Sequence, residues 1–289
     1  MTHEKKGEFY SILIALLESL FPIISIFILT AIQPIFAYSF SIMVANVVFI
    51  GIIIYKKSWE EFLVKEAWAD MLWLSFYITT LFLLIMIGLQ YTTAGNMSVI
   101  ISLQLFFSYL YFNIFGSEKM TTLHTFGALL MGIGAIIVLF PNDFSLNKGD
   151  ALIFMAAIIA PLVSKHQQKA RIFVSAKTIL TFRNIVALPF VLAFAFYMER
   201  IPTVEDISEV GAYILLNGIV IFVFSKLLFV EALNLISVTK LLALVSFMPI
   251  FTLIFAYFLL GETATWSQLV GVIPIVLGSY LITKKERLN

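Results

Sequence analysis

The chain has 289 residues, of which 61% are hydrophobic and only 12% are charged, and its mean hydropathy is +1.03. So few polar side chains cannot cover a water-soluble globule of this size, and the composition therefore indicates an integral membrane protein. The formal net charge of +1 excludes a dominant field for nucleic acid, and the absence of cysteine excludes disulfides and thiolate metal sites.

Ten apolar runs follow one another along the chain, and each is long enough to cross a bilayer as a helix. Inside lipid every backbone polar group must be paired within the segment, which favours helices over strands. We expect transmembrane helices over residues 9–30, 34–55, 68–89, 94–115, 121–140, 150–168, 174–198, 210–232, 237–260 and 264–283. The predicted fold class is an all-α integral membrane protein with ten transmembrane helices. The first run is expected to be retained, because no cleavage pattern follows it.

The two halves of the chain repeat one pattern. Residues 233–282 align without a gap with residues 89–138, which lie 144 positions upstream. In both segments an apolar run ends at a Glu, and the next apolar run carries two glycines seven residues apart. We therefore expect two five-helix repeats, residues 1–144 and 145–289. Because five is odd, the repeats must be inverted relative to each other, an arrangement typical of secondary transporters.

The positions of Lys and Arg predict the orientation in the membrane. If the N-terminus is cytoplasmic, the expected outer segments contain only Lys148 and Arg200, whereas most other basic residues fall in the inner segments. Basic residues concentrate on the cytoplasmic side of membrane proteins. Both termini are therefore expected in the cytoplasm, in a multi-pass protein of the cytoplasmic (inner) cell membrane.

A short pattern near the C-terminus carries a family resemblance. Leu259–Glu262 reads Leu-Leu-Gly-Glu, Gln268–Gly271 reads Gln-Leu-Val-Gly, and Gly278 follows seven residues later. The counterparts in the first half are Phe115–Glu118, Gly127 and Gly134. This pattern resembles the EamA-type branch of the drug/metabolite transporter superfamily over essentially the whole chain. The resemblance implies a monomer or weak dimer whose two halves enclose a cavity and work by gradient-driven alternating access, most commonly for export.

Glu18 lies about nine residues into the first predicted helix, near the bilayer centre. A charged carboxylate at this depth must face a cavity, pair with a cation or be protonated. Pro22, four residues later, has no N–H to donate to the Glu18 carbonyl. Ala15–Ser19 lacks the Trp that the family commonly has here, and a Glu near this point is similar to the small multidrug-resistance branch. That resemblance implies a substrate-binding and proton-coupling role for Glu18; the alternative is a protonated carboxyl bonded between helices.

Charged residues of the C-terminal half lie nearer the cytoplasmic side. Lys226 is the deepest lysine and has no acidic partner at helical spacing, so we expect it either to recognise an anion or to form an inter-helix ion pair. His166 could titrate near neutral pH or simply pack at the interface. Arg183 and Lys240 are expected to extend to the headgroups, and Lys240 is expected to pair with Glu231.

Neutral polar residues complete the predicted cavity lining. Gln104, Ser108 and Tyr111 fall at i, i+4 and i+7 and form one polar stripe on an otherwise apolar helix. Tyr77 and Thr80 occupy similar positions on the third helix. Each of these residues could instead form a hydrogen bond between helices. The predicted substrate-binding residues are Glu18, Tyr77, Thr80, Gln104, Ser108, His166 and Lys226.

Together these features predict a secondary active transporter of a small polar organic solute, an amino acid or amine-bearing metabolite. Its amino group would meet Glu18, and its carboxylate would meet Lys226 or the basic residues at the inner rim. One alternative is an organic-cation or drug carrier that works through Glu18, and a more distant one is a lipid-handling protein without transport. No enzyme is expected, because the chain has no Gly-x-Ser-x-Gly, His-Glu-x-x-His or paired-carboxylate motif. The expected partners are the solute and the lipid bilayer; no cofactor, metal or nucleic acid is expected.

Overall fold

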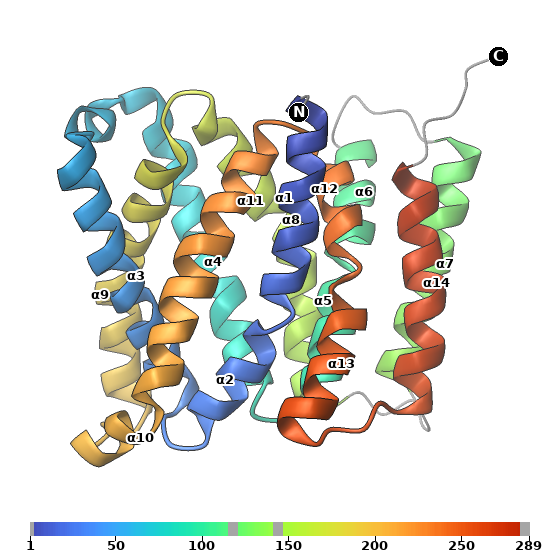
Figure 1. Cartoon of the computed structure of the whole chain (residues 1–289). Coiled ribbons are helices and arrows are strands. Elements are labelled where there is room, and N and C mark those ends of the chain that lie inside the picture. Colours follow the sequence, from blue (N-terminus) through green and yellow to red (C-terminus); the bar gives the residue numbers. More distant parts are fainter. Residues whose placement is uncertain (1–2, 115–120, 141–146, 284–289) are drawn as a thin grey trace.

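The computed structural model describes residues 3–114, 121–140 and 147–283, and within these ranges it is helical, with no strand. The helices run side by side and form a bundle (Figure 1). Within the described residues, nine helical segments are long and apolar enough to cross a membrane, and Trp266–Ile282 is a shorter tenth apolar helix. The predicted class, an all-α integral membrane protein, is confirmed.

The helices follow the predicted spans closely. In chain order they are α1 (His3–Glu18), α2 (Phe21–Leu29), α3 (Pro34–Lys56), η1 (Trp59–Leu63), η2 (Lys65–Ala67), α4 (Trp68–Gly88), α5 (Ala94–Ile101), α6 (Gln104–Ile114), α7 (Thr122–Leu139), α8 (Lys148–Arg171), α9 (Ala176–Met198), α10 (Val204–Leu216), η3 (Asn217–Ser225), α11 (Lys226–Leu233), α12 (Val238–Val245), α13 (Met248–Leu260) and α14 (Trp266–Thr283). Elements η1 and η2 are short 3-10 helices, and η3 is a π-helical segment between α10 and α11.

The eighth span begins earlier than predicted, at Val204 and not at residue 210. The Thr203 hydroxyl accepts a hydrogen bond from the Asp206 N–H at 3.2 Å, and the Asp206 carboxylate accepts one from the Thr203 N–H at 2.8 Å. This reciprocal capping box fixes the first turn of α10. The acidic stretch that the hydropathy pattern assigned to a loop is therefore helical.

The two repeats are visible in the starting points of the helices. Helices α12, α13 and α14 begin at residues 238, 248 and 266, each 144 residues after the first residues of α5, α6 and α7. The repeats are inverted, since α5 lies below α6 in Figure 1 whereas α12 lies above α13. The proposed boundary at residues 144 and 145, and the Glu118 end of the sequence pattern, lie outside the described residues.

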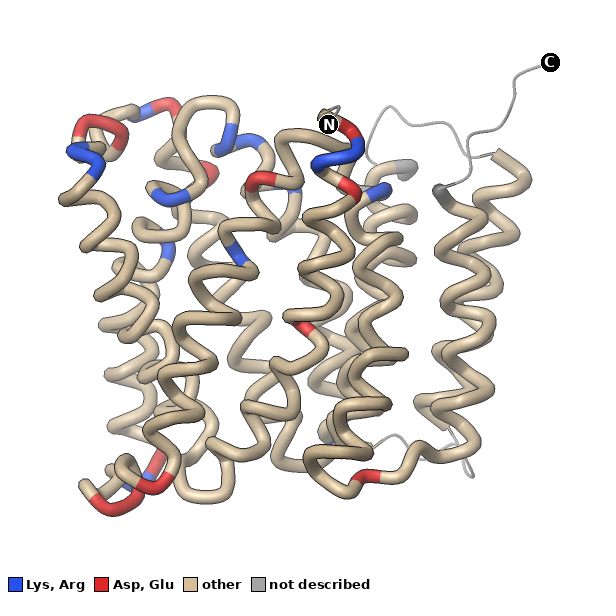
Figure 2. The backbone as a smooth tube through the Cα atoms, in the orientation of Figure 1, with Lys and Arg blue, Asp and Glu red and all other residues tan. Residues whose placement is uncertain are grey.

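The described ends of the chain, the start of α1 and the end of α14, lie at the same end of the bundle (Figure 1). We call this end the N-terminal face and the other end the opposite face. Lys and Arg residues gather mainly at the N-terminal face, and few charged residues lie between the two faces (Figure 2). By the positive-inside rule this distribution favours a cytoplasmic N-terminal face, which stays a prediction.

Helices α7 and α14 pack closely through glycines. A Cβ atom at Gly134 would lie 2.6 Å from the Gly271 carbonyl oxygen, and one at Gly127 would lie 2.7 Å from the Gly278 carbonyl oxygen. Small residues of this kind allow transmembrane helices to approach backbone to backbone. Gly132, on another side of α7, has nothing within 4 Å of its Cβ position.

Helices α3 and α9, one from each repeat, are joined by a carboxylate at the opposite face. Glu199 follows α9 directly and accepts hydrogen bonds from the N–H groups of Ile35, at 2.8 Å, and Phe36, at 2.9 Å, in the first turn of α3. An anion at a helix N-terminus is stabilised by the helix dipole and the unpaired N–H groups. Burial raises the pKa of the Glu199 carboxyl above its ordinary value. The hydrogen bonds from the two N–H groups lower this pKa, but by less than burial raises it.

A matching contact joins the same two helices at the N-terminal face. Glu61 follows α3, in η1, and accepts hydrogen bonds from the Ser175 N–H at 2.7 Å, the Ser175 hydroxyl and the Thr178 hydroxyl at 2.7 Å. Lys177 Nζ lies 3.3 Å from the other Glu61 oxygen. Partial burial alone would raise the pKa of the Glu61 carboxyl, but the hydrogen bonds from Ser175, Thr178 and Lys177 lower it to about 2. We call the Glu61 and Glu199 contacts the terminal clips.

The replacement Glu61→Gln is expected to lower the melting temperature at neutral pH and to remove part of the acid sensitivity of the protein. The pKa of Glu61 is lower in the folded chain, at about 2, than its ordinary value of 4.5, so the unfolded chain binds the proton first. The stabilisation is therefore fully present above about pH 4.5 and is lost as the pH falls toward 2. Thermal unfolding in detergent between about pH 7 and pH 3 measures both effects.

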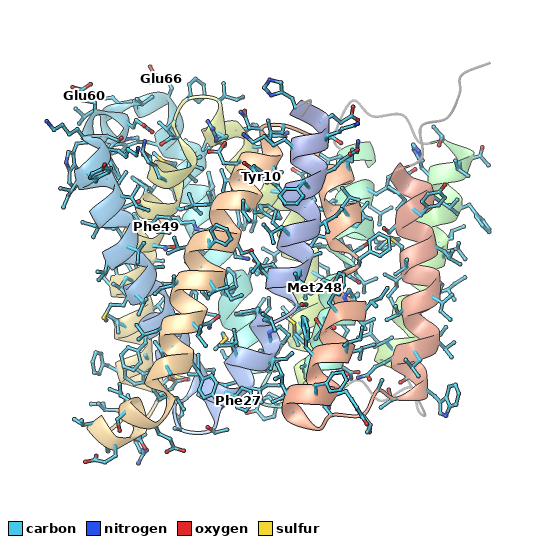
Figure 3. All side chains as sticks on the ribbon, in the orientation of Figure 1. Tyr10, Phe27, Phe49, Glu60, Glu66 and Met248 are labelled. Carbon is cyan, nitrogen blue, oxygen red and sulfur yellow. The ribbon has the colours of Figure 1, made fainter. Side chains whose placement is uncertain are left out.

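Glu60→Gln is the matched control, because Glu60 is the exposed neighbour of Glu61 (Figure 3). It makes the same chemical change without touching the clip. Equal pH profiles for the two variants would contradict a stabilising role for the Glu61 contact.

Candidate functional site

A cavity of about 90 Å³ lies between helices of both repeats. It can hold several water molecules or part of a small solute. Most of its lining is apolar, as in other small-molecule sites. The polar side chains that line it are Glu18, Gln104, Ser164, Gln167, Arg183 and Lys226. Met248 also lines the cavity and lies about midway between the two faces (Figure 3).

Three of the spans around this cavity are interrupted at its level. Helix α1 ends at Glu18, α5 gives way to α6 between Ile101 and Gln104, and α12 gives way to α13 between Val245 and Met248. All five of these residues line the cavity. Irregular backbone at membrane depth is tolerated where protein covers it or where it lines a cavity. Half-helices that end near the midplane are typical of transporter binding sites.

Local backbone features place Glu18 and Lys226 at the cavity. Pro22 lies in the first turn of α2 and prevents an unbroken helix from running through this point. Helix α1 accordingly ends at Glu18. Lys226 directly follows the π-helical segment η3 and begins α11. Single π-helical turns within longer helices are frequent at functional sites.

Glu18 and Lys226 form an ion pair between the two repeats. Lys226 Nζ lies 2.6 Å from Glu18 Oε1, and the Ser225 hydroxyl donates to the same oxygen. Only 12% of the Glu18 side chain and 14% of the Lys226 side chain are exposed. The ammonium also lies 5.3 Å from the centre of the Phe82 ring, a favourable cation–π position. Of the two roles expected for Lys226, the structure contains the inter-helix ion pair.

Arg183 also lines the cavity, and the expectation that it reaches the headgroups is wrong. Its side chain is 2% exposed, and Nη1 donates to Gln167 Oε1 at 3.4 Å. Arg183 shares a four-residue spacing with Ala187, Val191 and Ala195, which are all buried on α9. A helix repeats every 3.6 residues, so this spacing places the arginine on the inward side of α9. The run of small residues was the sequence signal that could have identified it.

The expected pair between Glu231 and Lys240 is also wrong. Glu231 pairs with Arg171 Nη2 at 3.0 Å. Lys240 Nζ lies 2.6 Å from a carboxylate oxygen of both Glu4 and Glu8 in the first turns of α1. Lys240 begins the ninth span beside the start of the first, so it meets acids that are distant in sequence.

The other predicted site residues divide into two groups. Gln104 lines the cavity with Glu18 and Lys226. Ser108, one helical turn further along α6, is buried but is not among the lining residues, and its hydroxyl has no hydrogen-bond partner in the described part of the chain. Thr80 donates to the Phe76 carbonyl of its own helix at 2.9 Å. The predicted stripe on α6 therefore meets the cavity at its first residue.

His166 and Tyr77 form a separate cluster on α8 and α4. His166 Nδ1 lies 2.7 Å from Asp70 Oδ1, a partner that the sequence pattern did not indicate. The His166 and Tyr77 rings stack at 5.7 Å, and the Trp73 ring stacks on His166 at 6.5 Å. Neither His166 nor Tyr77 is among the residues that line the cavity in the described structure.

The charges at the cavity are two cations and one carboxylate. The Glu18 carboxylate attracts both Lys226 and Arg183, and the two cations repel each other. This arrangement can receive a solute ammonium at Glu18 and an anionic group at the cations. Apolar walls around these groups strengthen each charge interaction relative to water.

The fold and this cavity are those of a multi-pass membrane protein with a site between its two repeats. The EamA-like transporter family model matches residues 5–140 and 147–284. The chain therefore belongs to the EamA-like transporter family, and the predicted resemblance is confirmed. The family and the names of the relatives point to transport.

Similar proteins carry matching descriptions. The chain is 25% identical over 237 residues to an "uncharacterized transporter" of Archaeoglobus fulgidus. This alignment covers 79% of this chain and 81% of the relative. The chain is 26% identical over 204 residues to the "uncharacterized transporter YoaV" of Bacillus subtilis, and this alignment covers 68% of each protein. A solved crystal structure matches 96% of this chain and 98% of its own with a TM-score of 0.72 at 12% identity, a likeness of fold.

Proposed function

We propose that this transporter is a secondary active carrier of a small polar solute with an amino group, an amino acid or related amine-bearing metabolite. The observation that carries this proposal is the ion pair between Glu18 and Lys226 in a cavity between the repeats. A carboxylate that already holds one ammonium in a largely apolar site is chemically suited to hold another. Residues 1–144 and 145–289 would be the units that move during alternating access.

In the proposed cycle, the solute ammonium replaces the Lys226 ammonium at Glu18. The Glu18 carboxylate then keeps a cationic partner at each stage, whereas the displaced Lys226 ammonium needs a new partner in the low-dielectric cavity, which an anionic group of the solute can supply. A proton on Glu18 would release Lys226 in the same way. Solute and proton thus compete for one oxygen, Glu18 Oε1, and this competition is the physical basis of the proposed coupling to a proton gradient.

An organic-cation carrier that works through Glu18 alone is the second candidate. Lys226 would then be a structural partner of Glu18. The two cations at the cavity oppose this reading, because a solute with only positive charge would be repelled by Arg183 and by the displaced Lys226. A solute that also carries an anionic group avoids this repulsion.

Flux measurements in proteoliposomes test the proposal. Wild-type protein is expected to move at least one member of a panel of amino acids and organic amines, faster with a pH gradient than without it. Glu18→Gln should reduce the gradient-driven flux about tenfold or more, since a charge-assisted hydrogen bond contributes about 1.5–3 kcal/mol. Lys226→Gln should leave flux of simple cations intact if the second candidate is right.

Glu8→Gln is the matched control, because Glu8 lies on the same helix but pairs with Lys240 away from the cavity. It should transport like wild type. A flux and pH response that survive Glu18→Gln unchanged, or a panel in which nothing moves, would rule out the proposed role of Glu18.

A further inference from the structure

We infer that Arg183 binds a carboxylate group of the solute, so that the cargo is a zwitterion and not a simple amine. The inference rests on the proposed function. It adds a second group of the solute, a carboxylate, and the residue that binds it. Anion binding was one of the two roles expected for Lys226, and the inference assigns it to Arg183 on α9.

The first observation is that Arg183 is buried without an acidic side chain paired to it. The Arg183 side chain is 2% exposed, and within the described residues no carboxylate forms an ion pair with it. Its Nε–H has no hydrogen-bond partner in the same part of the chain. Buried charges in proteins are otherwise paired, because taking an ion out of water is strongly unfavourable. Arg171, near the end of α8, follows that rule through Glu231.

The second step concerns Glu18, the acid that attracts Arg183 at the cavity. Its Oε1 oxygen is held by Lys226 at 2.6 Å and by the Ser225 hydroxyl. Its charge is therefore shared between two cations, and the closer one is Lys226. An anionic group on the solute would supply the compensation that Arg183 lacks.

The third step concerns shape. A guanidinium is a planar fork of N–H donors that matches the two oxygens of a carboxylate. Gln167 on α8 accepts from Nη1 at 3.4 Å and so orients the fork, while the buried Nε–H has no partner in the described part of the chain. Gln167 and Arg183 both line the cavity, as does Glu18. One solute with an ammonium and a carboxylate can therefore engage Glu18 and Arg183 together.

The test uses matched compounds and two readouts. Each amino acid of a panel is compared with the amine that lacks its carboxylate and the acid that lacks its amine; for leucine these are 3-methylbutylamine and 4-methylpentanoate. Binding is measured as the concentration-dependent rise in melting temperature of the purified protein, and transport as flux in proteoliposomes. The variants are Arg183→Gln, Arg183→Lys and, as a control outside the cavity, Arg171→Gln.

We expect amino acids to bind wild-type protein and to lose about tenfold or more in affinity in Arg183→Gln, whereas the matched amines, which Arg183 repels, should lose no affinity. Arg183→Lys keeps the charge but not the fork, so it should fall between wild type and Arg183→Gln. Arg171→Gln should bind like wild type. If Arg183→Gln does not fold, the loss in Arg183→Lys relative to the matched amine carries the test.

Other outcomes separate the two proposals. If amino acids and their matched amines bind equally and Arg183 variants affect both alike, or if no carboxylate compound binds wild type, Arg183 is not a carboxylate site and the inference is overturned. If amino acids bind through Arg183 but Glu18→Gln leaves their binding unchanged, Arg183 is still the carboxylate site and the proposed amine site at Glu18 fails.

Discussion

Replacing either member of the Glu18–Lys226 pair alone is expected to destabilise the protein by about 3–5 kcal/mol, whereas replacing both should restore most of that loss. Glu18→Gln leaves the Lys226 ammonium buried beside a neutral amide, and Lys226→Met removes the closer counter-ion of the Glu18 carboxylate. The double variant removes both charges from the cavity. Unfolding of the three variants in detergent gives the coupling energy of the pair.

One detail sharpens this expectation. The double variant should be folded yet unable to drive flux of amines, which separates the structural role of the pair from its role in transport. Destabilisations that simply add in the double variant would show that the two charges do not interact.

The second large effect is expected between α7 and α14. Gly134→Val would place a Cβ atom 2.6 Å from the Gly271 carbonyl oxygen and 2.7 Å from the Ile275 side chain. Because the obstacle includes backbone, the helices must separate, and we expect a loss at or above the usual range for overpacking, about 3 kcal/mol or more. Size-exclusion profiles and melting temperatures of the purified variant measure this loss.

Gly132→Val is the control, since it makes the same change two residues away where nothing lies within 4 Å of the Cβ position. It should change stability by less than about 1 kcal/mol. If both variants behave alike, helix propensity and not the close approach of α7 and α14 decides the effect.

Much of this architecture could be predicted from the sequence, because hydrophobic length and the 144-residue repeat are properties of the chain itself. The break after Glu18 could be predicted from Pro22. Pro249 gave a local signal for the break before Met248. The matching break before Gln104 has no proline and follows only from the repeat.

The site was harder to predict because it depends on how helices are rotated about their axes. A pattern of apolar residues that continues around a helix does not say which side faces the protein. The Glu18–Lys226 pair joins residues 208 positions apart, and the Asp70 partner of His166 does not follow from local spacing. These contacts arise when the two repeats pack together.

The terminal clips also fix a dimension of the protein. They hold α3 and α9, of 23 residues each, side by side at both faces, so this edge of the bundle is about 34 Å tall. The described parts of α7 and α14, of 18 residues each, form the other edge in Figure 1 and span about 27 Å. The hydrocarbon layer of a membrane is about 30 Å thick. We therefore expect lipids to stretch along the α3 and α9 edge, with the difference taken up by tilt of the protein or by local reshaping of the bilayer.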